Sequence, residues 1–250
     1  MKTLCVLLLS CVAAYGADTK NVDKTVPLST TGSVTLESHN GSIHVHTWDR
    51  AEIEIHARIE SGGSREEDRR RFDQTTVEID NTSSSVRIKS KYPEWNWSWF
   101  GSSGNSPQIH YTITAPSTAR WTVRNHNANV EMRDVNAALN LDTHNGSARI
   151  VNLGGPLEVN AHNGKFYVDF SSFKGATLDM HNGTAELVMP SSSRFDVRSS
   201  SHNGNVDSDF SILTRTMGRR NRGSLEGSVN GGGASLRLSF HNGHVRLRRK

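Results

Sequence analysis

The tripeptide His-Asn-Gly recurs along this chain and constrains its fold more than any other feature. Copies begin at His39, His144, His162, His181, His202 and His241, and a variant, His126-Asn127-Ala128, comes 18 residues before the second copy. From His126 to His202 the successive spacings are 18, 18, 19 and 21 residues. A short repeat of nearly constant length predicts a stack of similar units, each packed on its neighbours.

Apolar residues keep a fixed phase around the Asn of each copy. Around Asn145, for example, Leu141 stands four positions before and Ala148 three positions after, and apolar residues continue at alternate positions outward. This period of two is typical of half-buried strands. Each unit is therefore predicted to be two short strands joined at a corner, where Gly accepts a positive φ and Asn tolerates one.

Two architectures satisfy this pattern. The predicted corner residues are Asn145, Gly146, Asn163, Gly164, Asn182, Gly183, Asn203, Gly204, Asn242 and Gly243. They fit an all-β solenoid or β-helix-like stack, and they equally fit the type I′ hairpins of a β-meander or sandwich. The recurrence of His favours the solenoid, because a hairpin needs Asn-Gly but not His. We also expect the degenerate copy Val229-Asn230-Gly231 to add a rung.

The N-terminus has the features of an export signal. Lys2 precedes an apolar run that ends in Ala14-Tyr15-Gly16, so residues 1–16 are predicted to be a cleaved signal peptide. Cys5 and Cys11 lie within it, which leaves no disulfide in the remaining chain. No later run approaches the roughly 18 apolar residues of a transmembrane helix. We expect an exported protein of the periplasm, cell surface or extracellular space.

The remaining chain divides into two predicted regions that are continuous with each other. Residues 17–115 form an N-terminal β region with a charged insertion and a Trp-rich loop, and residues 116–250 form the repeat array. The charged run Arg65 to Arg71 predicts a short surface helix or a loop between strands at 52–59 and 76–80. Ser64 is its candidate N-cap, with Glu67 three residues later.

Aromatic residues gather in the Trp-rich loop. Trp95, Trp97 and Trp99 alternate with polar residues and are followed by Phe100, so on a strand the three indoles share one face. Such a face could bind sugar rings or an apolar patch of a partner. It could equally cover the open end of a solenoid.

The repeated histidines lie one position out of phase with the apolar residues and should face solvent. Stacking of rungs would turn them into a column of imidazoles. The candidate metal ligands for Zn, Cu or Ni are His126, His144, His162, His181 and His202. The alternative is a purely structural ladder beside the corner. The Asn column is expected to be structural, with its side chains satisfying corner amides.

From Val26 to Lys250 the sequence resembles a family of bacterial domains of unknown function that are proposed to be adhesins. Their repeats read apolar-x-apolar-x-Thr-x-Asn-Gly. The resemblance includes the charged insertion, the segment Ile113-Thr114-Ala115-Pro116 and the closing rung from Leu236 to Gly243. It implies an exported β-solenoid of a bacterial envelope and brings no catalytic residues. This chain differs by its His before most corners and by its Trp-rich loop.

No enzyme motif accompanies the repeat. Gly-x-Ser-x-Gly, a P-loop and His-Glu-x-x-His are absent from the sequence. We therefore expect a non-enzymatic interaction module without a cofactor or a nucleic-acid partner, binding an envelope polymer, a glycan or a protein. The alternatives are a passive envelope scaffold and, more distantly, a polysaccharide-active β-helix enzyme. The basic C-terminus (Arg246, Arg248, Arg249, Lys250) is either a solvated face or a contact for an anionic polymer.

Overall fold

The computed structural model describes residues 18–93, 105–214 and 224–250, which form strands and one short helix. The N-terminal region contains β1 (Thr19–Pro27), β2 (Ser33–Trp48), β3 (Glu52–Glu60), α1 (Glu66–Gln74), β4 (Thr76–Asn81), β5 (Ser85–Lys91) and β6 (Gln108–Pro116). The repeat array contains β7 (Arg120–Arg133), β8 (Leu139–Leu153), β9 (Leu157–Phe170), β10 (Ala176–Met189), β11 (Phe195–Ser208), β12 (Leu213–Thr214), β13 (Ser224–Val229) and β14 (Ala234–Arg249).

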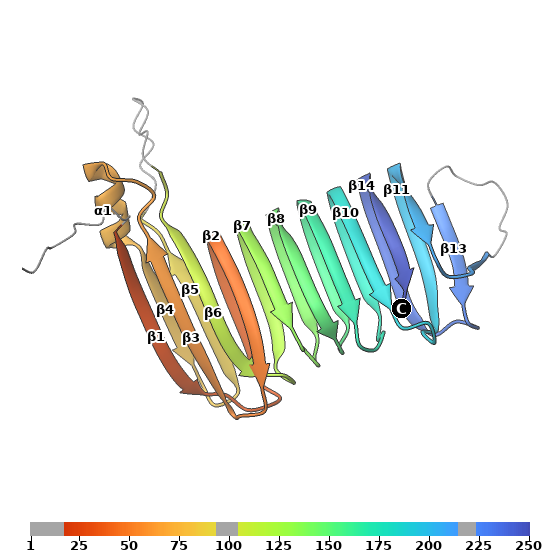
Figure 1. Cartoon of the computed structure of the whole chain (residues 1–250), viewed down its shortest axis with the longest axis horizontal. Helices are drawn as coiled ribbons and strands as arrows, with labels where there is room; N and C mark the ends of the chain where they lie inside the picture. The colour runs from red at the N-terminus through yellow and green to blue at the C-terminus, as the bar shows by residue number, and fades with distance from the viewer. Residues whose placement is uncertain (1–17, 94–104, 215–223) are drawn as a thin grey trace, which may run out of the picture.

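The described strands belong to one open sheet, whose central part is parallel (Figure 1). There β2, β7, β8, β9, β10, β14 and β11 are neighbours in that order, and each corner Asn lies opposite the next. Antiparallel pairs flank this stack at both ends. Strands joined by an Asn-Gly hairpin would be antiparallel neighbours. The parallel register therefore confirms the solenoid-like stack and excludes Asn-Gly hairpins.

Each long strand has two arms, which lie before and after its Asn-Gly. The first arm of β2, from Ser33 to Glu37, pairs with β5, whereas its second arm, from Gly41 to Trp48, pairs with β6. Alternate residues are buried in both arms; in β8, for example, Leu141 is 1% exposed and Ile150 is 0% exposed. A single layer could not bury both arms so completely. The sheet therefore folds over at the corners, and the core lies between the layers of first arms and second arms.

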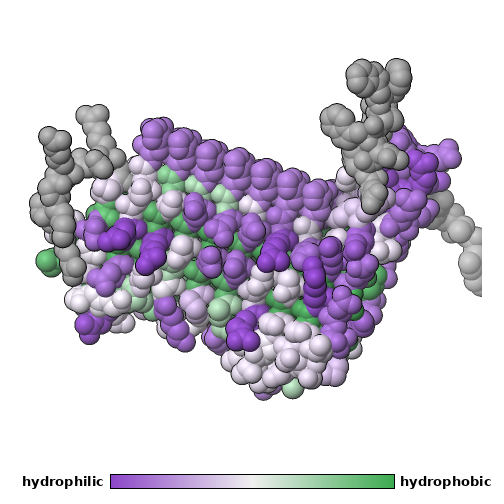
Figure 2. Space-filling view, turned by 180° about the vertical axis from the view of Figure 1, so that it is seen from behind, coloured by the Kyte–Doolittle hydropathy of each residue, from purple (hydrophilic) through white to green (hydrophobic). Residues whose placement is uncertain are grey.

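The corner reverses the alternation without ending the strand. In a regular strand, residues an odd number of positions apart face opposite sides of the sheet. Thr143 and Ala148 are separated in this way, yet both are buried. The alternation of buried and exposed residues is therefore shifted by one position at the corner. Sheet pairing nevertheless continues through the corner, and β8 spans 15 residues. The two short strands predicted for each unit are therefore one bent strand. Equivalent residues line up along the molecule, as the hydrophilic rows with hydrophobic surface between them show (Figure 2).

The corner glycines are needed for close approach rather than for a left-handed backbone. Of the described repeat glycines, only Gly41 (φ +124°) lies well inside the positive-φ region, and Gly183 (φ +158°) lies at its limit. A Cβ on Gly164 would lie 2.5 Å from the carbonyl oxygen of Gly146, and a Cβ on Gly183 would lie 2.3 Å from that of Gly164. The prediction of a positive φ is thus wrong for most of the Asn-Gly corners. Glycine is required there for another reason, since adjacent rungs leave no space for a side chain.

The order of the strands differs from their order in the sequence at one place. β14 lies between β10 and β11 although it follows both in the chain. Its Asn242 is opposite Asn182 on one side and Asn203 on the other. Consequently the rung that contains His241 separates two rungs that are consecutive in sequence.

A tight turn brings the chain into this position. Asn230 (φ +51°) and three following glycines with positive φ connect β13 to β14, which lie on opposite sides of β11. The Asn230 side chain donates hydrogen bonds to the carbonyl oxygens of Ser191 (3.1 Å) and Ser193 (2.8 Å), just before β11 begins. The prediction that Val229-Asn230-Gly231 adds a rung is therefore wrong, since this segment is the crossing turn.

The charged insertion forms helix α1, as predicted, but its N-cap is Arg65 rather than Ser64. The backbone N–H of Arg65 donates to the carboxylate of Asp68 at 3.3 Å, and that carboxylate also accepts a hydrogen bond from the backbone of Asn105. This buried carboxylate fixes where the helix begins, and Phe72 packs against the core. Among the described residues, no helix combines the length and apolar character needed to cross a membrane.

Candidate functional site

The imidazoles of the repeat form one continuous column on the outside of the corner. Within the described residues, six stacked pairs join seven rings, with centroids 4.6–5.0 Å apart and interplanar angles of 1–3°. Their order is His39, His126, His144, His162, His181, His241 and His202. The predicted solvent-facing stack is therefore present. The sequence analysis missed that His241 separates His181 from His202, because it assumed that stacking follows the order of the chain.

The column is closed at one end by an aromatic side chain. Tyr92 packs edge-on against His39, with ring centroids 5.7 Å apart. Burial, and secondarily the neighbouring charge of His126, lowers the pKa of His39. Nothing in the repeat pattern pointed to Tyr92, which lies outside the repeated units. At the other end, His202 stacks only on His241 among the described rings.

A ladder of side-chain amides runs beside the imidazoles. Each corner Asn except Asn40 donates its Nδ2 to the Oδ1 of the Asn on the neighbouring strand toward Asn40, at 2.7–3.2 Å, so all the bonds point the same way along the stack. The participants are Asn40, Asn127, Asn145, Asn163, Asn182, Asn242 and Asn203. These side chains therefore satisfy one another rather than the corner backbone. The ladder holds successive rungs in register and so keeps the imidazoles parallel.

A shallow groove of about 980 Å³ follows the column on the side of the first arms. One wall is the imidazole column itself. The other is a row of side chains three positions before each Asn, namely Glu37, Arg124, Asp142, Asn160, Asp179, Ser239 and Ser200. The floor contains Thr143, Ala161, Met180 and Phe240. The repeat pattern did not reveal this groove, because its walls depend on which strands are neighbours.

Two buried polar atoms of the groove lining have no hydrogen-bond partner among the described residues. They are the Oγ of Ser38 and the Nδ2 of Asn125, a residue that is only 8% exposed. Buried polar groups are normally paired, so each such atom requires an explanation. Both lie at the Tyr92 end of the groove, where a bound polar molecule could supply the missing partner.

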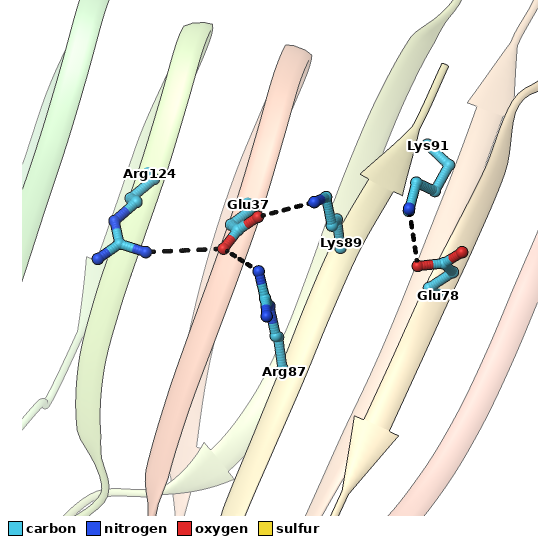
Figure 3. A network of polar contacts seen from close by, with 6 residues as sticks. All are labelled: Glu37, Glu78, Arg87, Lys89, Lys91 and Arg124. Carbon is cyan, nitrogen blue, oxygen red and sulfur yellow. Dashed lines mark hydrogen bonds and ion pairs between the residues drawn. The ribbon is translucent and has the colours of Figure 1, made fainter. Parts of the chain in front are cut away.

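The carboxylate at this end of the groove is held by three cations. Glu37 is paired with Arg87 (2.8 Å) and Lys89 (3.6 Å) of β5 on one side and with Arg124 (3.6 Å) of β7 on the other (Figure 3). Burial opposes its ionisation, but the hydrogen bond from Arg87 and the surrounding positive charges outweigh that effect and lower the pKa of the carboxyl. Asp142 and Asp179 have no ion pair with any described residue, so their carboxylates can accept hydrogen bonds from a ligand.

The column does not supply the geometry of a metal site. An imidazole nitrogen binds Zn at about 2.0–2.1 Å in the plane of its ring. Neighbouring rings of the column are parallel to within 3° and stacked with centroids 4.6–5.0 Å apart, so one ion cannot lie in the planes of both. No group of three or more His, Cys, Asp or Glu in the described part of the chain could hold a metal ion. Metal binding by His126, His144, His162, His181 and His202 therefore stays a prediction without a three-ligand arrangement to support it.

The other predicted contact residues, Trp95, Trp97, Trp99 and Phe100, lie outside the described residues. Their role as a binding face or a cap stays a prediction.

Several solved structures are similar to this chain. A proposed cell adhesion protein from Clostridium sporogenes is 9% identical, with a TM-score of 0.45 over 92% of this chain and 100% of that one. A proposed adhesin from Bacteroides fragilis is 9% identical, with a TM-score of 0.42 over 92% and 97% of the two chains. A proposed lipid binding protein from Parabacteroides distasonis is 10% identical, with a TM-score of 0.33 over 92% and 98%.

No curated protein matches the sequence. The family described as Toastrack DUF4097 matches residues 12–248, almost the whole chain and all of the parallel stack. The chain therefore belongs to the Toastrack DUF4097 family.

Proposed function

We propose that this protein is an exported, non-enzymatic interaction module of the bacterial cell envelope, and that it binds an extended hydroxyl-rich polymer such as a glycan strand along the groove beside the imidazole column. The observation that carries the proposal is the groove itself. Its walls are continuous rows of hydrogen-bonding side chains contributed by seven parallel strands. A linear polymer can meet such rows with successive units, whereas a compact ligand would contact only a few strands.

The chemistry of the two walls fits hydroxyl groups. The imidazole edges can donate or accept hydrogen bonds, Asp142 and Asp179 accept, and Asn160 does both. The partly apolar floor, at Ala161 and Met180, provides a surface for the C–H groups of a sugar. Glu37, at one end of the groove, is already paired with cations. The carboxylates without ion pairs, Asp142 and Asp179, lie along the middle of the groove and would repel a polyanion there.

Replacing the middle of the polar wall should abolish most of the binding. We expect Asp142→Ala/Asn160→Ala/Asp179→Ala to weaken co-sedimentation of the protein with purified peptidoglycan by about tenfold or more, as the loss of several charge-assisted hydrogen bonds implies. The matched control is Asn140→Ala/Glu158→Ala/Thr177→Ala, on the same three strands and the same face but two residues farther from the groove.

The control should bind like the unmodified protein, and both variants should melt normally. An equal loss in the two triple variants would exclude the groove as the contact surface. A normally folded protein that binds neither peptidoglycan nor other envelope polysaccharides would favour the passive scaffold.

A further inference from the structure

A second groove lies on the opposite side of the corner, over the second arms. It has a volume of about 700 Å³ and is lined by residues two and four positions after each corner Asn, together with the apolar row between them. Its apolar floor consists of Val130, Ala148, Phe166 and Ala185, all at most 4% exposed. The small side chains of Ala148 and Ala185 lie on the two sides of the large Phe166 ring. This groove shares no lining residue with the one beside the imidazoles.

Cations outnumber acids in this second groove, whose lining has three Lys or Arg and two Glu side chains. Glu131 is paired with Arg133, which lies outside the groove, and with His44 (3.5 Å), which lines it, and Glu186 is paired with Arg248 outside it at 2.8 Å. The hydrogen bond from Arg133 outweighs burial and lowers the pKa of Glu131, which therefore stays ionised and paired.

Three exposed cations of the groove, Arg149, Lys165 and Arg246, form no ion pair within 4 Å of any acidic residue that the structure describes. In the strand register Arg149 lies opposite Glu131, and Arg246 lies opposite Glu186 and Asp207, whereas Lys165 has no acidic residue opposite it. Of the basic C-terminus, Arg248 and Lys250 pair with Glu186 and Asp169, and Arg246 is the member that lines this groove. Unpaired cations around an apolar floor attract anions from solution.

The three cations are spread along the stack rather than gathered at a point. Arg149 belongs to β8, Lys165 to β9 and Arg246 to β14, with β10 between the last two. At about 4.8 Å per strand, the first and the last are about 14 Å apart across the sheet. The Arg149 guanidinium lies over the Tyr167 ring, 4.4 Å from its centroid, which restricts its position.

We infer that this second groove binds an extended anionic polymer, a chain that carries phosphate or carboxylate groups on successive units and lies across strands β8 to β14. A single small anion could not reach cations spread over three strands. A membrane surface fits less well, because the only large hydrophobic side chain exposed in the described residues is Leu213, which is outside the groove. The inference does not depend on the proposed function of the first groove.

Binding of two model polyanions tests the inference. Inorganic polyphosphate and poly-L-glutamate present phosphate and carboxylate groups respectively, and neutral dextran is the uncharged comparison. At low salt the unmodified protein should bind at least one polyanion and not dextran, with an affinity that falls as salt is added. Arg149→Gln/Lys165→Gln/Arg246→Gln should weaken that binding about tenfold, the effect expected from losing three solvent-exposed charge contacts.

The control variant removes the same net charge elsewhere. Arg120→Gln/Lys174→Gln/Arg237→Gln replaces three exposed cations outside the second groove and should change polyanion binding less than about twofold. Three outcomes would overturn the inference: equal loss in both triple variants, no binding of either polyanion by the unmodified protein, or binding of phosphatidylglycerol vesicles without binding of the polymers.

Discussion

Replacing Gly164 or Gly183 by valine should destabilise the protein by about 1–3 kcal/mol or more, because the corner has no space for a side chain. The added Cβ of Gly183→Val would lie 2.3 Å from the carbonyl oxygen of Gly164, and that of Gly164→Val would lie 2.5 Å from the carbonyl oxygen of Gly146. The backbone of the neighbouring strand is held by sheet hydrogen bonds, so it cannot move aside without breaking them. The rungs must therefore separate locally, which would weaken the amide ladder and the ring stack together.

Thermal and urea unfolding of each variant measure this effect. Thr184→Val and Ser147→Val place the same side chain at exposed positions next to the corner and should change the free energy of unfolding by no more than about 0.5 kcal/mol. An unchanged melting temperature in both glycine variants would show that the rungs are farther apart at the corner than the structure places them.

Acidification should destabilise the protein through the imidazole column. Adjacent ring centroids are 4.6–5.0 Å apart. Two unit charges at that distance repel by about 1 kcal/mol in water and by about 3.5 kcal/mol at an effective dielectric constant of 20. Protonated neighbours in the folded column therefore repel one another, whereas in the unfolded chain the histidines are far apart and accept protons near pH 6.5. The pKa of His39, lowered by burial and secondarily by the charge of His126, reflects this repulsion at one end of the column.

The sign of the pH dependence follows by linkage. Above the unfolded pKa of about 6.5 both states are neutral and the column contributes no penalty. As the pH falls below that value, repulsion between protonated neighbours in the folded column opposes folding, so stability falls. His56 acts in the opposite direction, because the hydrogen bond that its ring donates to the Asp23 carboxylate raises its pKa and gives stability that is lost as the pH rises.

Melts from pH 8 to pH 5 of the protein and of His144→Thr/His162→Thr/His181→Thr separate these contributions. His56 is common to both proteins, so their difference reports the column. The unmodified protein should lose about 2 kcal/mol more than the variant over this range, and added salt should reduce the difference. Parallel pH profiles would mean that the histidines do not interact as closely as the stack requires.

Much of the fold could be predicted from the repeat. The phase of Leu141 and Ala148 around Asn145 indicated the buried residues, and the recurrence of His indicated stacking rather than hairpins. The apolar pattern and the repeated tripeptide were sufficient to predict burial and stacking, because each rung places equivalent residues side by side. The same pattern could not show that each strand bends without ending, since buried positions alone do not reveal whether pairing continues through the corner.

The position of β14 could not be predicted, and the reason is physical. β11 and β14 carry the same His-Asn-Gly corner, preceded in both by alternate buried residues, so β10 could pair with either of them in the same register. What selects β14 is the crossing turn at Asn230, with its positive-φ glycines and its hydrogen bonds ahead of β11. The sequence suggested a degenerate rung at that point. The groove walls, likewise, become visible only once the order of the strands is known.

In the imidazole column His241 lies between His181 and His202, and disulfide formation between engineered cysteines tests this order of strands. Asp179 pairs with Ser239 of β14, whereas the equivalent residue of β11, Ser200, is two strands away. A disulfide needs Cα atoms about 4.4–6.8 Å apart, which adjacent strands provide and strands about 9.6 Å apart do not. With Cys5 and Cys11 replaced by serine, Asp179→Cys/Ser239→Cys should oxidise readily in the native state and Asp179→Cys/Ser200→Cys should not. Efficient oxidation of the second pair, with the first remaining reduced, would contradict the inserted strand and the column built on it.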